Sequence, residues 1–293
     1  MCSKVFVLGL VILVSSCRKL VSDDFPDFPS VPAINSVLIA DSLLTVNLSL
    51  TDKIGENILQ WVENAQVTIK TNDGLVDTLV YAENGTYKSR LFVQPMNTYS
   101  CQVKIPGYND INCKSDIPET PKIISILHIN ESGFDEEGTS YSAVKIKFRT
   151  NPEALQYYQI GIKLLRGEDV EFAQLEKIVD PILLNEGVPL LIFSNELIEE
   201  ESYTMTVNYT TGSAHSNGNG WQTSLYPFVV ELRAISSDYY MFLKSLYLYE
   251  KGRYPSDVGN GAVTNFNIYS NIAGGYGIFA GYSYALSDTI YPN

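Results

Sequence analysis

Hydrophobic residues recur at every second position along most of this chain, which is the period of a half-buried β-strand. Residues 34–39, 43–50 and 66–71 alternate in this way and are rich in Val, Ile, Leu and Thr, of which the β-branched members favour pleated surfaces. Between residues 33 and 118 about seven such strands follow one another at short intervals, with no helical period between them. The pattern predicts a β-sandwich of immunoglobulin or transthyretin type over residues 33–118.

A turn signal at Asn72-Asp73-Gly74 marks the clearest hairpin of this region. It separates the alternating residues 66–71 from a second apolar stretch at 75–81. An Asp-Gly pair between alternating strands is a strong hairpin signal, because glycine adopts the positive φ that tight turns require. We therefore expect these two stretches to pair as antiparallel neighbours.

Cys101 and Cys113 lie in the two arms of another predicted hairpin, in which residues 99–105 and 111–117 alternate around a Pro-Gly turn. Folding the segment at this turn places Cys101 opposite Cys113. Facing residues of a non-hydrogen-bonded pair have Cα atoms about 4.5 Å apart, within reach of a disulfide. Outside the cytoplasm such a pair oxidises, so a cross-strand disulfide is the hypothesis. Two buried free thiols are the alternative that the sequence leaves open.

Pro118-Glu119-Thr120-Pro121 is the best candidate for a domain boundary, because its prolines interrupt regular structure. Residues 119–293 then form a second β-rich domain. Its predicted strands cover residues 123–129, 143–149, 157–165, 202–209, 228–235 and a glycine-rich segment at 274–282. The period is lost over residues 168–190, which we expect to be a long loop over the sheet. The glycine- and asparagine-rich residues 211–222 are expected to be a flexible loop.

One helix is well specified, at residues 237–249. Ser236 or Ser237 can cap its first turn, and Asp238 suits the positive end of the helix dipole. Four apolar residues recur at helical spacing, namely Tyr239, Phe242, Leu243 and Leu246. Gly252 is expected to end the helix. We expect the apolar face to pack on a sheet of the second domain.

Residues 1–16 have the organisation of a secretory signal: Lys4 is basic, residues 5–14 are apolar, and two serines precede Cys17. The apolar run is too short to cross a hydrocarbon core of about 30 Å as a helix. A cysteine after two small residues resembles the lipobox of bacterial lipoproteins, in which that cysteine becomes the lipidated first residue. Cys17 is therefore the predicted site of lipid attachment. An ordinary signal with an incidental cysteine, or a tail cut from a longer protein, is the alternative.

Residues 17–32 are acidic and punctuated by prolines, without a helical period, and they predict an extended tether. The cluster Ser22-Asp23-Asp24, shortly after the cysteine, is similar to the surface-export signal of Bacteroidetes lipoproteins. A solvated linker without such a signal is the alternative. These features favour a lipid-anchored protein of the outer membrane, on the cell surface rather than on the periplasmic face.

The charge balance narrows the set of partners. The chain has a formal net charge of −13, with 20 Lys and Arg against 33 Asp and Glu. Nucleic acid requires a basic face, as does electrostatic binding to anionic lipid head groups, so neither is expected. The 20 tyrosines and 12 phenylalanines argue against a disordered chain and agree with a mostly β protein.

Motifs of catalysis and of cofactor binding lack the context that their chemistry requires. Residues 214–218 nearly fit a nucleophile elbow, but an elbow requires a following helix and a later histidine, and none follows His215. Residues 275–280 fit a dinucleotide fingerprint in letters only, because that fingerprint opens a helix and this segment has the pattern of a strand. The 2 histidines make no zinc motif. The acidic runs 135–137 and 199–201 are expected to be solvated, a weak calcium site being the alternative.

Several short blocks together resemble one known family. They are Asn64-Ala65-Gln66-Val67, Gly85-Thr86-Tyr87, Asn97-Thr98-Tyr99, Asn151-Pro152, Tyr157-Tyr158, Ile192-Phe193-Ser194-Asn195, Ile235-Ser236-Ser237-Asp238-Tyr239-Tyr240, Tyr269-Ser270-Asn271-Ile272 and Gly275-Tyr276-Gly277-Ile278-Phe279. The set is similar to domain-of-unknown-function family 4249 of Bacteroidetes lipoproteins, over nearly the whole mature chain. Asn195 and Tyr276 depart from the family, which often has aspartate and leucine there. The resemblance implies an outer-membrane lipoprotein, often encoded beside TonB-dependent transporters, and it carries over no catalytic residue.

We therefore expect a non-enzymatic binding or accessory protein that works with a TonB-dependent transporter in nutrient uptake, without a cofactor. Two alternatives stay open. One is a surface enzyme that acts on glycans through carboxylates that the sequence does not pair, and the other is an adhesin or matrix component. Loops on a rigid scaffold commonly carry binding, so residues 211–222 and 254–261 are the candidates for the contact.

Overall fold

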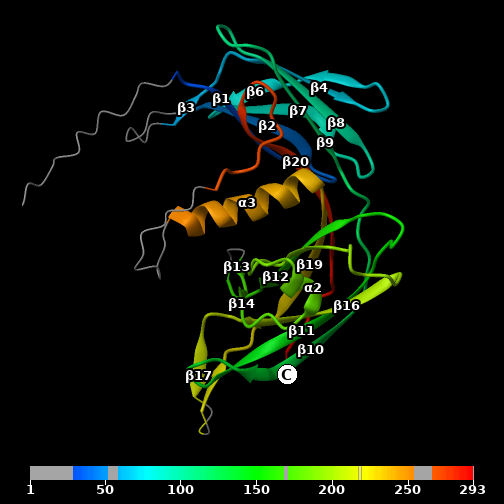
Figure 1. Ribbon diagram of the computed structural model, residues 1–293, viewed down its shortest axis with the longest axis vertical. Coiled ribbons are helices and arrows are strands. Elements are labelled where there is room, and N and C mark those ends of the chain that lie inside the picture. The colour runs from blue at the N-terminus through cyan, green and yellow to red at the C-terminus, as the bar shows by residue number, and fades with distance from the viewer. Residues whose placement is uncertain are drawn as a thin grey trace, which may run out of the picture.

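The computed structural model describes residues 29–51, 59–167, 171–216, 218, 220–253 and 266–292. The predicted signal peptide, Cys17, most of the predicted tether and the predicted loop 254–261 lie outside the described residues. The described chain forms two β-rich lobes along the long axis of Figure 1, with helix α3 (Ser237–Arg253) between them. The expectation of a mostly β protein with one long helix is confirmed.

Two facing sheets build the upper lobe. Its strands are β1 (Pro32–Ile39), β2 (Leu43–Leu50), β3 (Gln60–Trp61), β4 (Gln66–Thr71), β5 (Val76–Thr78), β6 (Val80–Glu83), β7 (Thr86–Phe92), β8 (Thr98–Lys104) and β9 (Ile111–Asp116). One sheet has the order β5-β4-β8-β9, and β1, β2, β7 and β6 form one end of a larger sheet. Alternate residues of both sheets point inward, so that side chains such as Leu48, Val67 and Tyr99 share one core. Two sheets around one core are the sandwich that alternation predicted.

The predicted hairpin at Asp73-Gly74 is present, but its second arm is divided between the two sheets. Gly74 has a φ of +88°, and β4 pairs with β5 across the turn. At Leu79 the chain leaves the four-stranded sheet, and β6 joins β7 in the other one. The buried Leu79 side chain belongs to the core between the sheets. The single strand expected over residues 75–81 is therefore a corner of the sandwich.

The lower lobe has a core of its own. Its elements are β10 (Ile123–Phe134), β11 (Thr139–Arg149), β12 (Tyr157–Leu164), β13 (Glu171–Phe172), β14 (Gln174–Leu175), α2 (Pro181–Asn185), β15 (Ile192–Ser194), β16 (Ser202–Thr210), β17 (Ala214–Ser216), β18 (Trp221–Thr223) and β19 (Phe228–Ile235). One sheet has the order β14-β16-β11-β18-β17, with β10 also paired to β11. The other contains β13, β12 and β19. Phe148, Phe193 and Val230 are buried between them.

Strand β20 (Tyr276–Leu286) joins the two lobes. It pairs in parallel with β1 from Ala33 to Ile39, and antiparallel with β19 on its other side. The result is one 10-stranded sheet that runs through both lobes (Figure 1). The predicted boundary at residues 118–121 thus separates two cores but not two sheets, because the last strand of the expected second domain also extends the sheet of the first.

Glycines explain how closely β20 approaches its neighbours. Gly277 has a φ of +101°, which side chains rarely adopt. A Cβ at Gly277 would collide with the carbonyl oxygen of Ile34, and one at Gly281 would collide with the Ile117 side chain. The structure therefore confirms the strand predicted for this glycine-rich segment, and the glycines permit close backbone packing.

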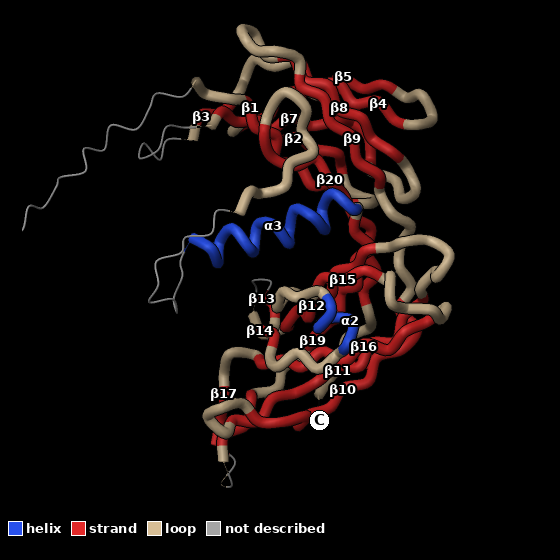
Figure 2. Tube along the Cα trace, in the orientation of Figure 1, coloured by secondary structure: helices blue, strands red, loops and turns tan. Residues whose placement is uncertain are grey.

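Helix α3 starts where the sequence predicts and ends later. The Tyr239 N–H donates to the Ser236 hydroxyl at 3.3 Å, as expected of a cap. The helix continues through Gly252 to Arg253, beyond the expected end at Tyr249. Figure 2 shows it as the one long helix among strands.

Helix α3 covers the face of the continuous sheet that is turned away from both cores. Tyr240 is buried on it, whereas the predicted contact residues such as Phe242 are half-buried. Tyr240 belongs to a cluster that includes Tyr282 of β20 and Val37 and Ile39 of β1. The helix therefore packs on both lobes rather than on the second domain alone, because β20 brings β1 beneath it.

Two stretches that were expected to be loops contain regular structure. The described part of residues 168–190 includes β13, β14 and α2, and Ile182 and Leu183 of α2 are buried in the lower core. The described part of residues 211–222 is mostly the hairpin of β17 and β18, with His215 opposite Gln222. These elements are too short to show a period, so their tertiary contacts decide their structure.

Candidate functional site

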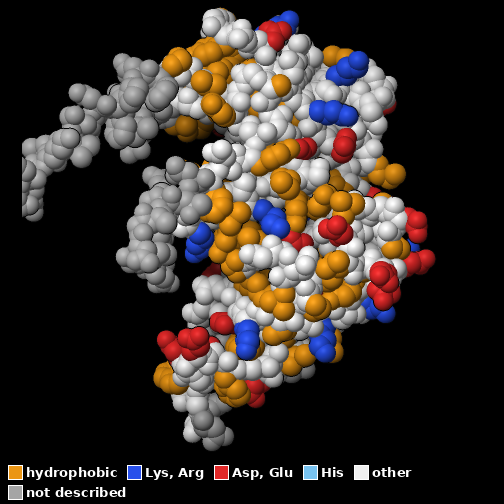
Figure 3. Space-filling view, in the orientation of Figure 1, with side chains coloured by type: hydrophobic (Ala, Val, Ile, Leu, Met, Phe, Trp, Pro, Cys, Tyr) orange, Lys and Arg blue, Asp and Glu red, His pale blue; other side chains and the backbone are white. Residues whose placement is uncertain are grey.

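A cleft of about 370 Å³ lies between α3 and the outer face of the lower lobe. Its walls are mostly apolar and come from β13, β14, the residues around β15, and α3: Phe172, Ala173, Leu175, Pro189, Leu190, Leu191, Ile192 and Leu243. Gln159, Gly161 and Arg233 also line it. Figure 3 shows hydrophobic side chains gathered along α3 and the strands below it, with basic side chains among them. Apolar walls with a few convergent polar groups are typical of a small-molecule site.

The polar groups of the cleft follow from the alternation of β19. Val230 and Leu232 point into the lower core, so Glu231 and Arg233 point to the opposite face. Arg233 Nε donates to Glu231 Oε1 at 2.8 Å, and Arg233 Nη1 donates to Gln159 Oε1 at 2.9 Å. Lys163 of β12 forms an ion pair with the second oxygen of Glu231. Three charged side chains and one amide, all on β12 and β19, thus form the polar floor of the cleft.

The Glu231 carboxylate is buried and ionised. Its side chain is only 3% exposed. Burial alone would raise the pKa of Glu231, but the hydrogen bond from Arg233 and the ion pair with Lys163 outweigh burial and hold the pKa below its usual range. Two cations share this one anion, so the floor keeps a net positive charge although the whole chain is acidic.

Strand β20 contributes the aromatic support of this floor. The Arg233 guanidinium carbon lies 4.7 Å from the ring centroid of Tyr282, within cation–π range. The Tyr282 ring stacks in turn with Tyr239 of α3, with 6.2 Å between centroids. The orientation of Arg233 therefore depends on β12, β19, β20 and α3 together.

A second buried carboxylate attaches α3 to the lower lobe beside the cleft. Glu186 Oε1 accepts the Ser194 N–H at 2.8 Å, and Glu186 Oε2 accepts from Lys244 Nζ at 3.0 Å. The Tyr240 hydroxyl also donates to Glu186 Oε2. Burial and this hydrogen bond raise the pKa of Tyr240. These contacts fix the position of α3 over the cleft.

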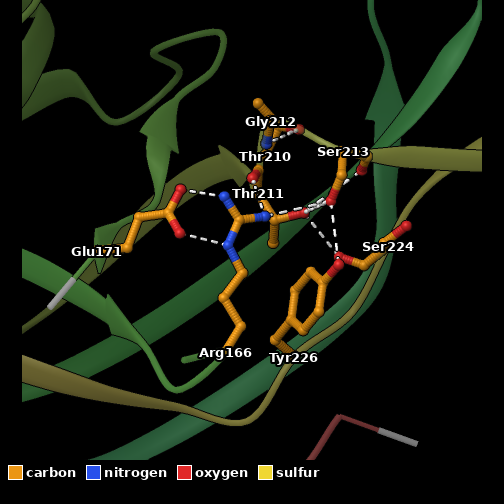
Figure 4. Close-up of polar contacts among 8 residues, drawn as sticks. All are labelled: Arg166, Glu171, Thr210, Thr211, Gly212, Ser213, Ser224 and Tyr226. Carbon is orange, nitrogen blue, oxygen red and sulfur yellow. Dashed lines mark hydrogen bonds and ion pairs between the residues drawn. The ribbon is translucent and has the colours of Figure 1, made fainter. Parts of the chain in front are cut away.

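A polar cluster at the far end of the lower lobe holds the β17–β18 hairpin (Figure 4). Arg166 forms a two-point ion pair with Glu171, and its Nη1 donates to the Thr211 carbonyl oxygen at 2.9 Å. The hydroxyls of Ser213 and Tyr226 lie 3.3 Å apart, and the Arg166 guanidinium lies over the Tyr226 ring at 5.2 Å. The ion pair with Arg166 lowers the pKa of Glu171. The cluster contacts residues on both sides of the hairpin, in the described part of a segment that was expected to be a flexible loop.

Two exposed aromatic residues lie at this end of the lower lobe, one on β18 and one on β10. Trp221 is 58% exposed and Phe134 is 63% exposed. Trp221 is paired with Thr139 of β11, and Phe134 is paired with Ser140, the next residue of β11, so both aromatic residues lie at the same end of the sheet. We call this pair the distal tip.

The acidic run 135–137 lies in the turn beside the distal tip. Asp135 Oδ1 accepts the N–H groups of Glu137 at 2.9 Å and Thr139 at 2.7 Å, so this carboxylate supports the turn. Among the described residues, no three His, Cys, Asp or Glu side chains lie close enough together to hold a metal ion. The side chains of Glu136 and Glu137 are exposed, in agreement with the solvated run that the sequence predicts.

The histidines and the cysteines each have local partners. His215 lies in β17 with its Nδ1 3.3 Å from the Ser224 hydroxyl, and His128 Nε2 lies 2.9 Å from the Tyr209 hydroxyl. Cys101 faces Cys113 across β8 and β9, as the hairpin predicted. Both thiols are buried and free in the structure, so the disulfide stays a prediction. The two cysteines also border a shallow hollow of about 610 Å³ on the four-stranded sheet.

The residues of the cleft were missed at the sequence level. The only local signal was Glu231 and Arg233, two charges on one face of an otherwise apolar strand. Such a pair indicates that one face of the strand carries charged side chains, but it does not indicate which other elements pack over that face. Lys163, Gln159 and Tyr282 join them from two other strands, which no spacing in the sequence reveals.

These features define a two-lobed β protein with a ligand-sized cleft where its long helix covers the common sheet. A family model described as "Domain of unknown function (DUF4249)" matches residues 19–287, and the chain belongs to this family. The family suggested by the sequence motifs is thereby confirmed. No curated protein matches the chain. Within the described residues, every helix is too short or too polar to cross a membrane.

Proposed function

We propose that this chain is a non-enzymatic binding protein, held at the outer membrane by a lipid on Cys17, that works with a TonB-dependent transporter in nutrient uptake. The lipobox-like residues before Cys17 and the acidic stretch after it support the anchor. A tether of this kind raises the local concentration of the folded body near any transporter in the same membrane. The cell surface is the proposed location.

The cleft under α3 is the observation that carries the binding function. Its charged groups are already paired with one another, and they are fixed by strands rather than by loops. Pre-positioned polar groups among apolar walls favour the binding of a ligand at little cost in conformational entropy. Paired charges in a fixed arrangement suit recognition better than proton transfer, which requires groups whose pKa values are driven apart.

The distal tip is the proposed contact with the transporter. Exposed Trp and Phe side chains are typical anchors of protein interfaces, and the Arg166 cluster holds this hairpin in place. The described chain begins in the upper lobe, and the hairpin lies at the opposite end of the long axis (Figure 1). The first described residues and the proposed contact surface therefore lie at opposite ends of the molecule.

Photocrosslinking in intact cells tests this proposal. A benzoylphenylalanine in place of Trp221 should capture a TonB-dependent transporter. Leu184 on α2 is the matched control position, because both side chains are 58% exposed, and it should capture much less. Equal capture from both positions would exclude the distal tip as the contact. Capture of no transporter, together with turnover of a glycan by the purified chain, would contradict the proposed function.

The anchor has its own test. Metabolic labelling with a palmitate analogue should mark the wild-type protein and not the Cys17→Ala variant. Equal labelling of the two proteins would exclude Cys17 as the site of lipid attachment.

A further inference from the structure

We propose that the cleft under α3 binds a small amphipathic anion, with its anionic oxygens at Arg233 and its apolar body against Phe172, Leu190 and Leu243. This inference rests on the proposed binding function and specifies its ligand. A carboxylate or sulfonate attached to an alkyl or aryl group is the ligand chemistry.

The charge of the ligand follows from the pairing in the floor. Both oxygens of Glu231 are engaged, one by Arg233 and one by Lys163, and the side chain is almost fully buried. Glu231 therefore cannot serve a cationic ligand. The two cations exceed their single anion by one positive charge, which an anionic ligand would balance.

Arg233 has the donors for this role. Its Nε is used by Glu231 and its Nη1 donates to Gln159. Among the described residues, Arg233 Nη2 has no acceptor. The side chain is 19% exposed and lines the cleft. A partly covered guanidinium with unused N–H groups is a strong site for an anionic oxygen, because such hydrogen bonds are charge-assisted.

The apolar part of the ligand follows from the walls. The Phe172 ring lies over Gly161, where a Cβ would come within 2.8 Å of the ring carbon Cε1. The absence of a side chain at Gly161 therefore leaves room for this ring beside the polar floor. Phe172 itself is 46% exposed, so an apolar ligand that covered it would remove apolar surface from water. A cleft of about 370 Å³ is near the lower end of the range for small-molecule sites.

Two fluorescent probes with the same ring system distinguish the contribution of the negative charge to binding from that of the apolar rings. Anilinonaphthalene sulfonate is an aromatic anion, and phenylnaphthylamine has the same rings without the sulfonate. Titrations use the full chain carrying Cys17→Ala in every variant, so that the N-terminal segment contributes equally to each measurement. We expect the sulfonate to bind at least about tenfold more tightly than the neutral probe, as a charged hydrogen bond in a covered site allows.

Two pairs of variants locate the probe. Arg233→Met should weaken sulfonate binding about tenfold and leave the neutral probe nearly unchanged, whereas Arg233→Lys should retain part of the preference. Phe172→Glu and Phe172→Lys remove the same exposed ring and introduce opposite charges, so the lysine variant should bind the sulfonate more tightly than the glutamate variant. Phe172 is the cross-strand neighbour of Lys163, but its variants keep Lys163, Glu231 and Arg233 in the chain, so the pair tests the site even if Arg233→Met does not fold.

Each other outcome has a distinct meaning. Equal affinity for both probes, unchanged by Arg233→Met, would contradict the proposal that the ligand is an anion. It would leave the proposed binding function standing. Sulfonate binding that is the same in both Phe172 variants would place the probe elsewhere and overturn the site. Failure of both probes to bind, with a transporter still captured through Trp221, would overturn the ligand and not the proposed partnership.

Discussion

The two arginine–glutamate pairs of the lower lobe have the same chemistry in different surroundings. Their guanidinium side chains are almost equally exposed, 19% for Arg233 and 23% for Arg166. Their carboxylates differ, because Glu231 is 3% exposed and Glu171 is 45% exposed. Glu231 lies inside β19, between β12 and β20, whereas Glu171 lies in β13 at the edge of the sheet.

This difference in burial assigns the two pairs different roles. A buried carboxylate that loses its partners keeps the full cost of desolvation, so Glu231 requires both Lys163 and Arg233. An exposed pair is screened by water and contributes little to global stability. The Arg166 pair instead orders a local hairpin, and the Arg233 pair is part of the structure that supports the cleft.

Loss of the buried carboxylate should have the largest effect. Glu231→Ala leaves Lys163 and Arg233 as two unpaired, partly buried cations, and should reduce the free energy of unfolding by about 3–5 kcal/mol. A urea titration measures this change. Glu231→Gln keeps the volume and some of the hydrogen bonds, so it should cost less. A loss below about 1 kcal/mol in Glu231→Ala would show that water already screens this site.

Loss of the Tyr240 hydroxyl, which donates to the buried carboxylate of Glu186, should have an intermediate effect on stability. Tyr240→Phe keeps the ring in its cluster but takes one donor from Glu186, which retains Lys244 and the Ser194 N–H. The expected loss is about 1.5–3 kcal/mol, as for a hydrogen bond to a charged group. Tyr247→Phe, on the same helix, is the control. Equal losses in the two variants would argue against the contact with Glu186.

Lowering the pH should destabilise the protein through both pairs, and more through the buried one. The expected change in the free energy of unfolding is smaller than that of the two preceding variants. Both glutamates have a pKa below the usual 4.5, so each contributes stability that is complete above that pH and is lost as pH falls through the lowered pKa. Because only Glu231 is buried, Glu231→Gln should reduce the loss of stability between neutral and acidic pH more than Glu171→Gln does. Urea unfolding titrations of both variants at several pH values measure this loss of stability. The reverse order would contradict the ranking by burial.

Breaking the exposed pair should have the smallest global effect. Arg166→Ala should lower the global free energy of unfolding only slightly, and by less at high salt. Its effect should be local, because Arg166 also donates to the Thr211 carbonyl oxygen. Hydrogen exchange of the backbone over residues 211–224 should become faster while the lower core stays protected. A large loss of global stability would mean that the hairpin is part of the cooperative unit.

Local patterns in the chain were sufficient for several elements. The Asp73-Gly74 turn, the facing of Cys101 and Cys113, and the capping of α3 by Ser236 all depend on residues close together in sequence. Turn chemistry, strand period and helix capping act over a few residues. These features could be predicted because no distant contact overrides them.

The misplaced elements have a common cause. The hairpin of β17 and β18 has few apolar residues and many small polar ones, so its composition indicates a loop. Its structure depends on pairing with β11 and on the Arg166 cluster. The burial of Tyr240 in place of Phe242 likewise depends on which strands lie under α3.

The sequence by itself determined a mostly β chain with one well-specified helix, and the family to which the protein belongs. Only the tertiary structure decided that β20 lies between β1 and β19, and therefore that both lobes share one sheet. It also decided the cleft, since Gln159, Arg233 and Tyr282 come from three different strands. The physical reason is that alternation specifies which face of a strand is covered, whereas pairing between distant strands specifies what covers it.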